Sequence, residues 1–154
     1  MTAVMRLVAL AAVALAVGTG CAEGAAPGQS LPVRHEPEPL TQRFPGLGEP
    51  LTTEWVSWDN NSERGAAPGP STVWIEAVVE LRPDRAGELR ALSVLTGEDP
   101  DLRDPLRPLL PAGPFRTGRA LDRALTGETA SEWWPRAYLE ETGNRLVLLA
   151  VLPA

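Results

Sequence analysis

The chain has 154 residues, of which 44% are hydrophobic and 22% are charged, a composition typical of a single globular domain. Its 20 acidic residues outnumber its 14 basic ones, and a net charge of −6 argues against nucleic acid as a partner. Every basic residue is Arg, which points to a high-GC coding sequence, and 16 Pro with 14 Gly predict short elements joined by many loops.

The N-terminal segment has the pattern of an export signal. Arg6 precedes an unbroken apolar run at residues 7–17, and the small residues Gly18-Thr19-Gly20 follow it. The run is too short to cross a bilayer as a helix, which takes about 20 residues. A basic start, a short apolar run and small residues are typical of a secretory signal peptide. We therefore predict that residues 1–20 are a signal peptide and that the protein is exported.

A single Cys follows this signal directly. The segment Val17-Gly18-Thr19-Gly20-Cys21 resembles the lipobox of bacterial lipoproteins. The resemblance implies cleavage before Cys21 and attachment of a lipid to its thiol, which would anchor the protein at the outer face of the cell membrane. Together with the Arg-only composition, it resembles the small lipoproteins of high-GC Gram-positive bacteria. The alternative is an ordinary signal peptide, cut after Ala16-Val17-Gly18, and a secreted protein.

A tether is expected between Cys21 and the folded domain. Residues 22–43 are rich in Pro, Gly and Glu and poor in apolar side chains. Such a segment buries too little apolar surface to offset the entropy lost on ordering. We predict a flexible or polyproline-like linker over residues 21–43 and one domain at residues 44–154. A Pro-rich ligand for a partner is the alternative for the linker.

Two strands are predicted early in the domain. Residues 51–58 are enriched in Thr, Trp and Val, which favours a strand. Residues 72–82 alternate with a period of two, so that the odd-numbered residues from Val73 to Leu81 form one apolar face. We expect that face to lie in the core. The even-numbered face is expected to contact solvent or to lie under a helix with Arg partners.

Helices are predicted in the middle of the domain. A first helix is expected at residues 84–95, with an apolar stripe that includes Leu89, Leu92 and Leu95. The Pro-rich residues 98–118 have room for at most one helical turn, and residues 119–126 form a short amphipathic helix.

The C-terminal part of the domain is predicted to hold one more helix and a strand. The helix is expected to begin at Trp134-Pro135 and to end at Gly143-Asn144. Residues 145–152 are apolar without alternation, which indicates a strand covered on both faces and placed beside residues 72–82. The predicted fold is α+β, a small antiparallel sheet of about three strands with helices packed on one side.

The residue inventory argues against several chemistries. His35 is the only His and lies in the predicted tether, and Cys21 is the only Cys. Catalysis by a Ser-His-Asp or Cys-His arrangement and a transition-metal site would all need more of these residues. Four acidic residues between Glu98 and Asp104 offer oxygen ligands of the kind that bind calcium, but a solvated acidic loop is favoured. We predict no cofactor, no metal and no catalytic residue.

Five Trp beside one Tyr and two Phe are unusual for a domain of this size. We expect Trp55 and one of the adjacent pair Trp133 and Trp134 to lie in the core. A candidate ligand surface remains on the outer face of the second strand and at the Trp pair. Its members are Trp74, Glu76, Glu80, Trp133 and Trp134.

The function that fits these observations is a membrane-tethered extracytoplasmic binding or interaction module. Its partner would be an envelope protein or a glycan. One alternative is a carboxylate-based hydrolase of cell-wall glycans, in which Glu76 and Glu80 would act beside Trp74. A second alternative is a structural accessory of an envelope complex. Catalysis is less expected than binding, because binding by exposed Trp and Arg does not need a general base whose pKa is shifted toward neutral pH.

Overall fold

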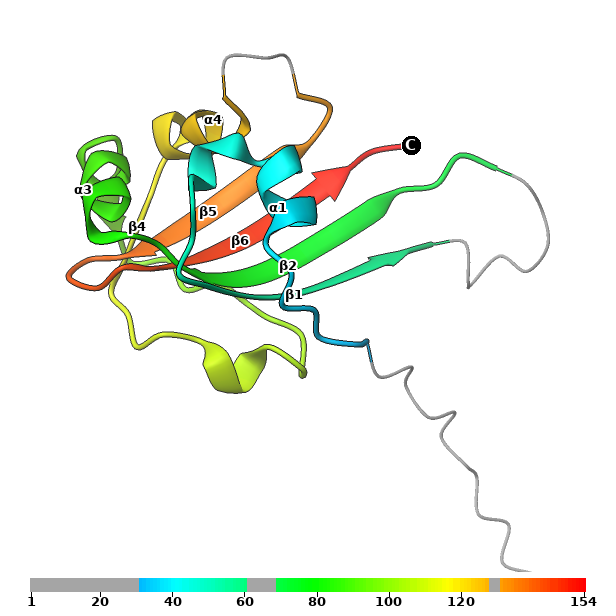
Figure 1. Cartoon of the computed structure of the whole chain (residues 1–154), viewed down its shortest axis with the longest axis horizontal. Coiled ribbons are helices and arrows are strands. Elements are labelled where there is room, and N and C mark those ends of the chain that lie inside the picture. Colours follow the sequence, from blue (N-terminus) through cyan, green and yellow to red (C-terminus); the bar gives the residue numbers. More distant parts are fainter. Residues whose placement is uncertain (1–30, 61–68, 128–130) are drawn as a thin grey trace, which may run out of the picture.

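The computed structural model describes residues 31–60, 69–127 and 131–154. They form one six-stranded antiparallel sheet of order β1-β2-β6-β5-β4-β3 with three α-helices (Figure 1). The elements are β1 (Thr52–Asp59), β2 (Val73–Glu80), α3 (Pro83–Ala91), β3 (Val94–Thr96), β4 (Phe115–Thr117), α4 (Arg119–Thr126), β5 (Trp134–Glu140) and β6 (Arg145–Leu152), preceded by α1 (Glu38–Arg43), with 3₁₀ turns at Pro45–Leu47 and Arg107–Leu109. Over these ranges no helix is long and apolar enough to span a membrane. The α+β class is confirmed, but the sheet has six strands instead of three.

Strand β6 joins the two halves of the sheet. It pairs with β2 along one edge, from Arg145 opposite Glu80 to Leu152 opposite Val73, and with β5 along the other. Residues 146–148 of β6 are buried, as the apolar run without alternation predicted for a strand covered on both faces. The central position of this strand beside β2 is likewise confirmed.

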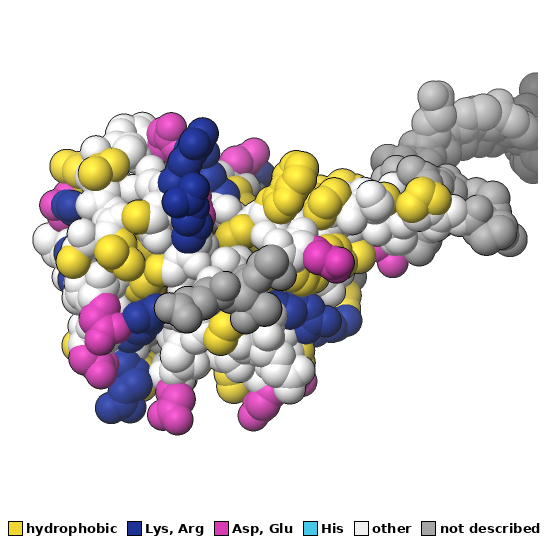
Figure 2. Space-filling view, turned by 90° about the horizontal axis from the view of Figure 1, so that it is seen from above, with side chains coloured by type: hydrophobic (Ala, Val, Ile, Leu, Met, Phe, Trp, Pro, Cys, Tyr) yellow, Lys and Arg dark blue, Asp and Glu magenta, His cyan; other side chains and the backbone are white. Residues whose placement is uncertain are grey.

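Three helices cover one face of the sheet, which we call the helical face. The odd-numbered residues of β2 point to it, including Ile75 and Val79, and they pack against buried leucines of the helices such as Leu40, Leu89 and Leu121. Figure 1 shows α1, α3 and α4 above the sheet. Viewed from above in Figure 2, Arg and acidic side chains are interspersed over the visible described residues of this face.

The Pro-rich segment covers the opposite face, which we call the loop face. Leu102 and Leu106 of this segment are 2% and 0% exposed and belong to a second core cluster with Val78 and Val147. The even-numbered face of β2 is therefore largely buried under a loop, and the expectation of a solvent face or of a covering helix is wrong there. The short 3₁₀ turn at Arg107–Leu109 agrees with the single turn predicted in this segment.

The helix predicted at residues 84–95 ends earlier, at Ala91. The Ser93 hydroxyl donates to the Arg90 carbonyl oxygen at 2.9 Å, and so does its backbone N–H at 3.2 Å. These bonds close the last turn and redirect the chain into β3. Leu92 and Leu95 are consequently 46% and 53% exposed instead of forming a buried stripe.

The helix predicted to begin at Trp134-Pro135 is the strand β5. The backbone N–H of Ala137 donates to Asp122 Oδ1 of α4 at 2.8 Å, so this N–H points away from β6. Because alternate residues of a strand point their N–H groups the same way, the N–H that Pro135 lacks would also have pointed away from β6. Pro135 therefore costs the sheet no hydrogen bond. Gly143 belongs to the turn of the β5–β6 hairpin rather than to a helix end.

The N-terminal boundary of the domain also differs from the prediction. Arg34 and Trp55 exchange two backbone hydrogen bonds of 2.8 and 2.9 Å along the edge of β1. The Trp55 indole N–H donates to the Glu36 carbonyl oxygen at 3.0 Å, and Leu40 of α1 is fully buried. The tether predicted over residues 21–43 is therefore wrong for residues 31–43, which belong to the folded domain. The predicted signal peptide and Cys21 lie outside the described residues.

The segment after α1 is fixed to the helical layer through a close approach at Gly46. A Cβ added to Gly46 would lie 1.8 Å from the Ala124 carbonyl oxygen of α4, so a side chain here would push the two backbones apart. The Arg85 side chain of α3 donates through Nε to the Gly46 carbonyl oxygen at 2.6 Å, and Leu47 is fully buried. The N-terminal segment is thus attached to α3 and α4 as well as to β1.

Candidate ligand surface

Three Trp side chains lie in one row across an end of the loop face. The strand register places Trp58 opposite Trp74, Trp74 opposite Val151, and Val151 opposite Trp134. Directly opposed residues of antiparallel strands point to the same face of a sheet. With strands about 4.8 Å apart, this aromatic row (Trp58, Trp74, Val151 and Trp134) extends roughly 14 Å over four strands. Trp134 is 68% exposed and the other three are half-buried, so a ligand can reach the row.

The side chains at the β1 end of the row are ordered by contacts with one another. The Trp58 and Trp74 rings are nearly parallel, with an interplanar angle of 7° and centroids 6.0 Å apart. The guanidinium of Arg103, from the Pro-rich segment, lies 3.9 Å from the centroid of Trp58. A cation over an indole face is attracted by the ring quadrupole, which holds the loop against this ring.

A second row lies two residues further along the same strands. It consists of Val56, Glu76, Leu149 and Arg136, again in direct register. Arg136 forms an ion pair with Glu98, which follows β3. Together with Arg103, these side chains set two carboxylates and two guanidinium groups beside the aromatic row. Arg103 and Glu98 are the ion-pair partners of the two charged members of this second row. We use the name charged row for these four charged side chains, which are Glu76, Glu98, Arg103 and Arg136.

Glu76 is the buried member of the charged row. It is 9% exposed, and its Oε2 accepts the backbone N–H of Arg103 at 2.8 Å, while Oε1 lies 3.9 Å from Arg103 Nε. Burial raises the pKa of the Glu76 carboxyl, and the hydrogen bond and charge of Arg103 act in the opposite direction. Glu76 therefore attaches the Pro-rich segment to the sheet.

The raised pKa of Glu76 predicts a pH-dependent contribution to stability. A folded state with a raised pKa binds a proton more readily than the unfolded chain, so protonation favours folding. As the pH falls from neutral toward 4.5, the ordinary pKa of this group, we expect the wild type to gain stability relative to Glu76→Gln. The gain is at most about 1.4 kcal/mol per pH unit, the limit for one proton.

Urea unfolding of both proteins between pH 7 and pH 5 measures this difference. The Asp122 carboxyl, whose pKa burial also raises, is present in both proteins and cancels in the comparison. A constant difference between the two proteins across this range would contradict the assignment.

The structure brings together three of the five residues proposed for the ligand surface. Trp74, Glu76 and Trp134 share the loop face at neighbouring register positions. Trp133 instead packs against the helical core, edge-to-face with Phe44 at a centroid distance of 5.8 Å, and so is the core member of the Trp pair. Its exclusion from the ligand surface follows from strand alternation, because adjacent residues of an extended chain point to opposite faces.

Glu80 is the other residue that does not join the row. It lies opposite Thr52 and Arg145, at the far end of β2 from Trp74. Glu76 and Glu80 are separated by four residues of strand, or about 13 Å. This exceeds the separation of the two carboxylates in glycoside hydrolases, which is roughly 5–9.5 Å. The pair therefore gives no support to the carboxylate-based hydrolase.

Besides Val151, sequence reasoning missed four members of the two rows: Trp58, Glu98, Arg103 and Arg136. Trp58 could have been found, because it lies at alternate spacing from Val56 in a predicted strand. The other three depend on long-range contacts for which the local sequence has no signal, since Glu98 and Arg103 come from irregular segments and Arg136 was assigned to a helix.

The other chemistry-bearing residues that the structure describes do not assemble a site. Within the described ranges, no group of three or more His, Cys, Asp or Glu residues is placed to hold a metal ion. In the acidic loop, Asp101 and Asp104 instead pair with Arg107 at 3.7 and 3.2 Å. His35 lines a hollow of about 60 Å³ near Thr52, far smaller than the roughly 300–1,000 Å³ of organic ligand sites.

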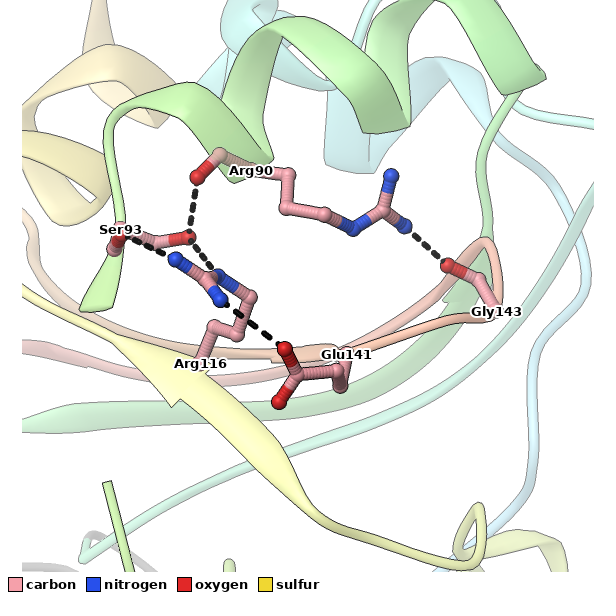
Figure 3. A network of polar contacts seen from close by, with 5 residues as sticks. All are labelled: Arg90, Ser93, Arg116, Glu141 and Gly143. Atoms are coloured by element: carbon pink, nitrogen blue, oxygen red, sulfur yellow. Dashed lines mark hydrogen bonds and ion pairs between the residues drawn. The ribbon is translucent and has the colours of Figure 1, made fainter. Parts of the chain in front are cut away.

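A separate polar network joins α3 to β4 and to the β5–β6 hairpin (Figure 3). Arg116 of β4 donates to the Ser93 carbonyl oxygen at 2.9 Å and pairs with Glu141 at 3.1 Å. Arg90 of α3 donates to the Gly143 carbonyl oxygen. Both Arg side chains thus satisfy backbone carbonyl groups at places where the chain turns, which is a structural role.

Comparison of the chain with protein-family models, with curated proteins and with solved structures finds no match. The support for a function accordingly comes from the aromatic row and the charged row. Of the surfaces described above, they combine the most exposed large hydrophobic side chain with neighbouring charged groups.

Proposed function

We propose that the protein is a membrane-tethered extracytoplasmic binding module, and that the aromatic row is its ligand surface. The observation that supports this most is the exposure of Trp134, at 68%, in register with two further Trp side chains. A side chain this exposed adds little burial free energy to the fold, and its alignment with two further Trp side chains makes it part of a contiguous aromatic surface, which is typical of interaction sites. Trp134 is adjacent to Trp133, which already packs against the core, so core packing does not account for it.

The covering of the loop face also favours a binding role for its open end. Leu102 and Leu106 bury the middle of this face, where Val78 and Val147 lie. The aromatic row lies at one end of the same strands and stays half-buried or exposed. Aromatic anchors that combine an apolar body with a polar N–H are the side chains most enriched in binding surfaces.

The proposed anchor would hold this surface close to the envelope. Leu31 and Val33, at the start of the described chain, pack against the loop-face core cluster, as Trp58 does. The chain leading back to Cys21 therefore joins the domain on the face that carries the aromatic row. The residues from Cys21 to Leu31 can span at most roughly 35 Å.

The anchor itself predicts that a fatty-acid label is attached to the wild type and is lost in the Cys21→Ser variant. Equal labelling of the wild type and the variant would refute the anchor.

The binding function predicts a specific loss on removal of one side chain. In a chain that begins at residue 21 and carries Cys21→Ser, which lacks both the predicted signal peptide and the proposed lipid, we expect binding to isolated cell envelopes. Trp134→Ala is expected to weaken this binding at least tenfold, because an aromatic anchor contributes on the order of 2 kcal/mol. Equilibrium cosedimentation with the envelopes measures the effect, and the thermal melting point of each variant checks folding.

Leu95→Ala is the matched control for this experiment. Leu95 is 53% exposed and lies on β3, at the opposite edge of the sheet from β1. We expect its binding to equal that of the wild type. If Leu95→Ala lost binding and Trp134→Ala did not, the exposed β3 edge would be the contact surface, and a structural accessory of an envelope complex would replace the present proposal.

A further inference from the structure

We infer that the ligand of the aromatic row is a neutral polysaccharide, a chain of uncharged sugar units lying across β1, β2, β6 and β5. This inference rests on the proposed binding function and names the chemistry of its ligand. The shape of the row, the balance of charge beside it and the state of the neighbouring strand edge each favour such a ligand.

The shape of the row favours a long and narrow ligand. The row is one residue wide and extends roughly 14 Å across four strands. Because the Trp58 ring is covered by Arg103 and stacked with Trp74, Trp74 is the aromatic contact at this end of the row, and Trp134 forms another about 10 Å from Trp74. A pyranose ring presents a flat face of C–H groups that packs on an indole, so consecutive sugar units would meet consecutive contacts along this row.

The charged row favours a ligand that is neutral and rich in hydroxyl groups. Each guanidinium beside the aromatic row has a carboxylate partner, Arg103 with Glu76 and Arg136 with Glu98. An anionic ligand would have to compete with these carboxylates, and the net charge of −6 would repel it further. A sugar hydroxyl both donates and accepts hydrogen bonds, so it can bond to either member of a pair without breaking it. Arg103, Arg136 and Glu98 have side chains that are 51–53% exposed and can be reached.

The neighbouring strand edge disfavours an extended peptide as the ligand. A peptide that adds to a sheet needs free backbone groups along an edge. On β5, which carries the exposed Trp134, Pro135 has no N–H and the N–H of Ala137 is taken by Asp122. This strand therefore offers an added peptide no backbone N–H donor at Pro135 or Ala137. This condition suits a sugar chain stacked on indoles.

The experiment is a titration of the same chain from residue 21, carrying Cys21→Ser, with soluble oligosaccharides. Neutral oligomers of N-acetylglucosamine and of glucose, two to six units long, are compared with a sulfated oligomer of equal length. We expect at least one neutral series to bind with affinity that rises with length, to change the Trp fluorescence and to depend little on salt. The sulfated oligomer should bind at least tenfold more weakly.

Matched variants connect the binding to the row. Trp134→Ala should reduce the affinity for the longer oligomers at least tenfold, Trp134→Phe should retain most of it, and Leu95→Ala should be unchanged. Absence of binding by every neutral oligomer, preference for the sulfated one, or equal loss in Leu95→Ala would each overturn the inference. If envelope binding still depends on Trp134 in that event, the proposed function stands and only the carbohydrate ligand is refuted. If envelope binding does not depend on Trp134, both fall.

Discussion

Replacing Ile75 by Asp is expected to unfold the domain. Ile75 is 2% exposed at the centre of the helical face, where it lies between Ser57 of β1 and Ala150 of β6. A carboxylate buried at this position without a partner costs several kcal/mol. That cost is of the order of the whole stability of a small domain, roughly 5–15 kcal/mol. Circular dichroism at 25 °C should show the loss of β structure, or urea unfolding should show a strongly lowered midpoint.

Val94→Asp is the control for this substitution. It also replaces a β-branched apolar strand residue by Asp, but Val94 is 60% exposed on the edge strand β3. A surface substitution of this kind changes stability by about 0.5 kcal/mol or less. Equal destabilisation by Ile75→Asp and Val94→Asp would mean that the core is assigned to the wrong face of the sheet.

Leu40→Ala is expected to lower the free energy of unfolding by about 2–5 kcal/mol. Leu40 is fully buried in the helical layer, although its segment has the composition of a linker. This decrease is the sum of two free energies, the burial free energy of the removed side-chain atoms and the cost of the cavity that they leave. Urea unfolding measures it as a lower midpoint at an unchanged slope.

Leu92→Ala provides the comparison, because Leu92 is 46% exposed just after α3. Its effect is expected to be small. Should Leu40→Ala be as mild as Leu92→Ala, residues 31–43 would not be part of the cooperative domain, and the original tether boundary at residue 43 would be restored.

The elements that could be predicted are those whose local pattern agrees with their tertiary surroundings. The helix at Arg119–Thr126 was predicted with its bounds, because Leu121 and Leu125 mark one face and Gly follows the last turn. The long strands were predicted from different patterns: enrichment in Thr, Trp and Val in β1, a period of two in β2, and an apolar run without alternation in β6. In each case the local preference and the packing favour the same conformation.

The missed elements are those that long-range pairing decides. Strands β3 and β4 have three residues each, too few for a period of two to be recognised. Pro135 suits both the first turn of a helix and a strand position whose N–H would point away from β6. The strand position is supported by Asp122, thirteen residues away in the chain, which accepts the N–H of Ala137 on that side of β5. The ligand surface has the same limit. Alternation placed Trp74 and Glu76 on one face, but the alignment with Trp134 requires the register of β6 with both of its neighbours.

The central place of β6 has a consequence for the order in which the chain folds. The β1–β2 hairpin and the β3–β5 part of the sheet are paired only through β6 in the described structure, and β6 follows both of them in the sequence. Until residues 145–152 are available, the two parts cannot pair through this strand and their central edges stay open. Contacts of such long sequence separation form slowly. A chain translocated with its N-terminus first would therefore remain incompletely folded until β6 was synthesised. Until then it could still pass through a narrow channel as an extended chain.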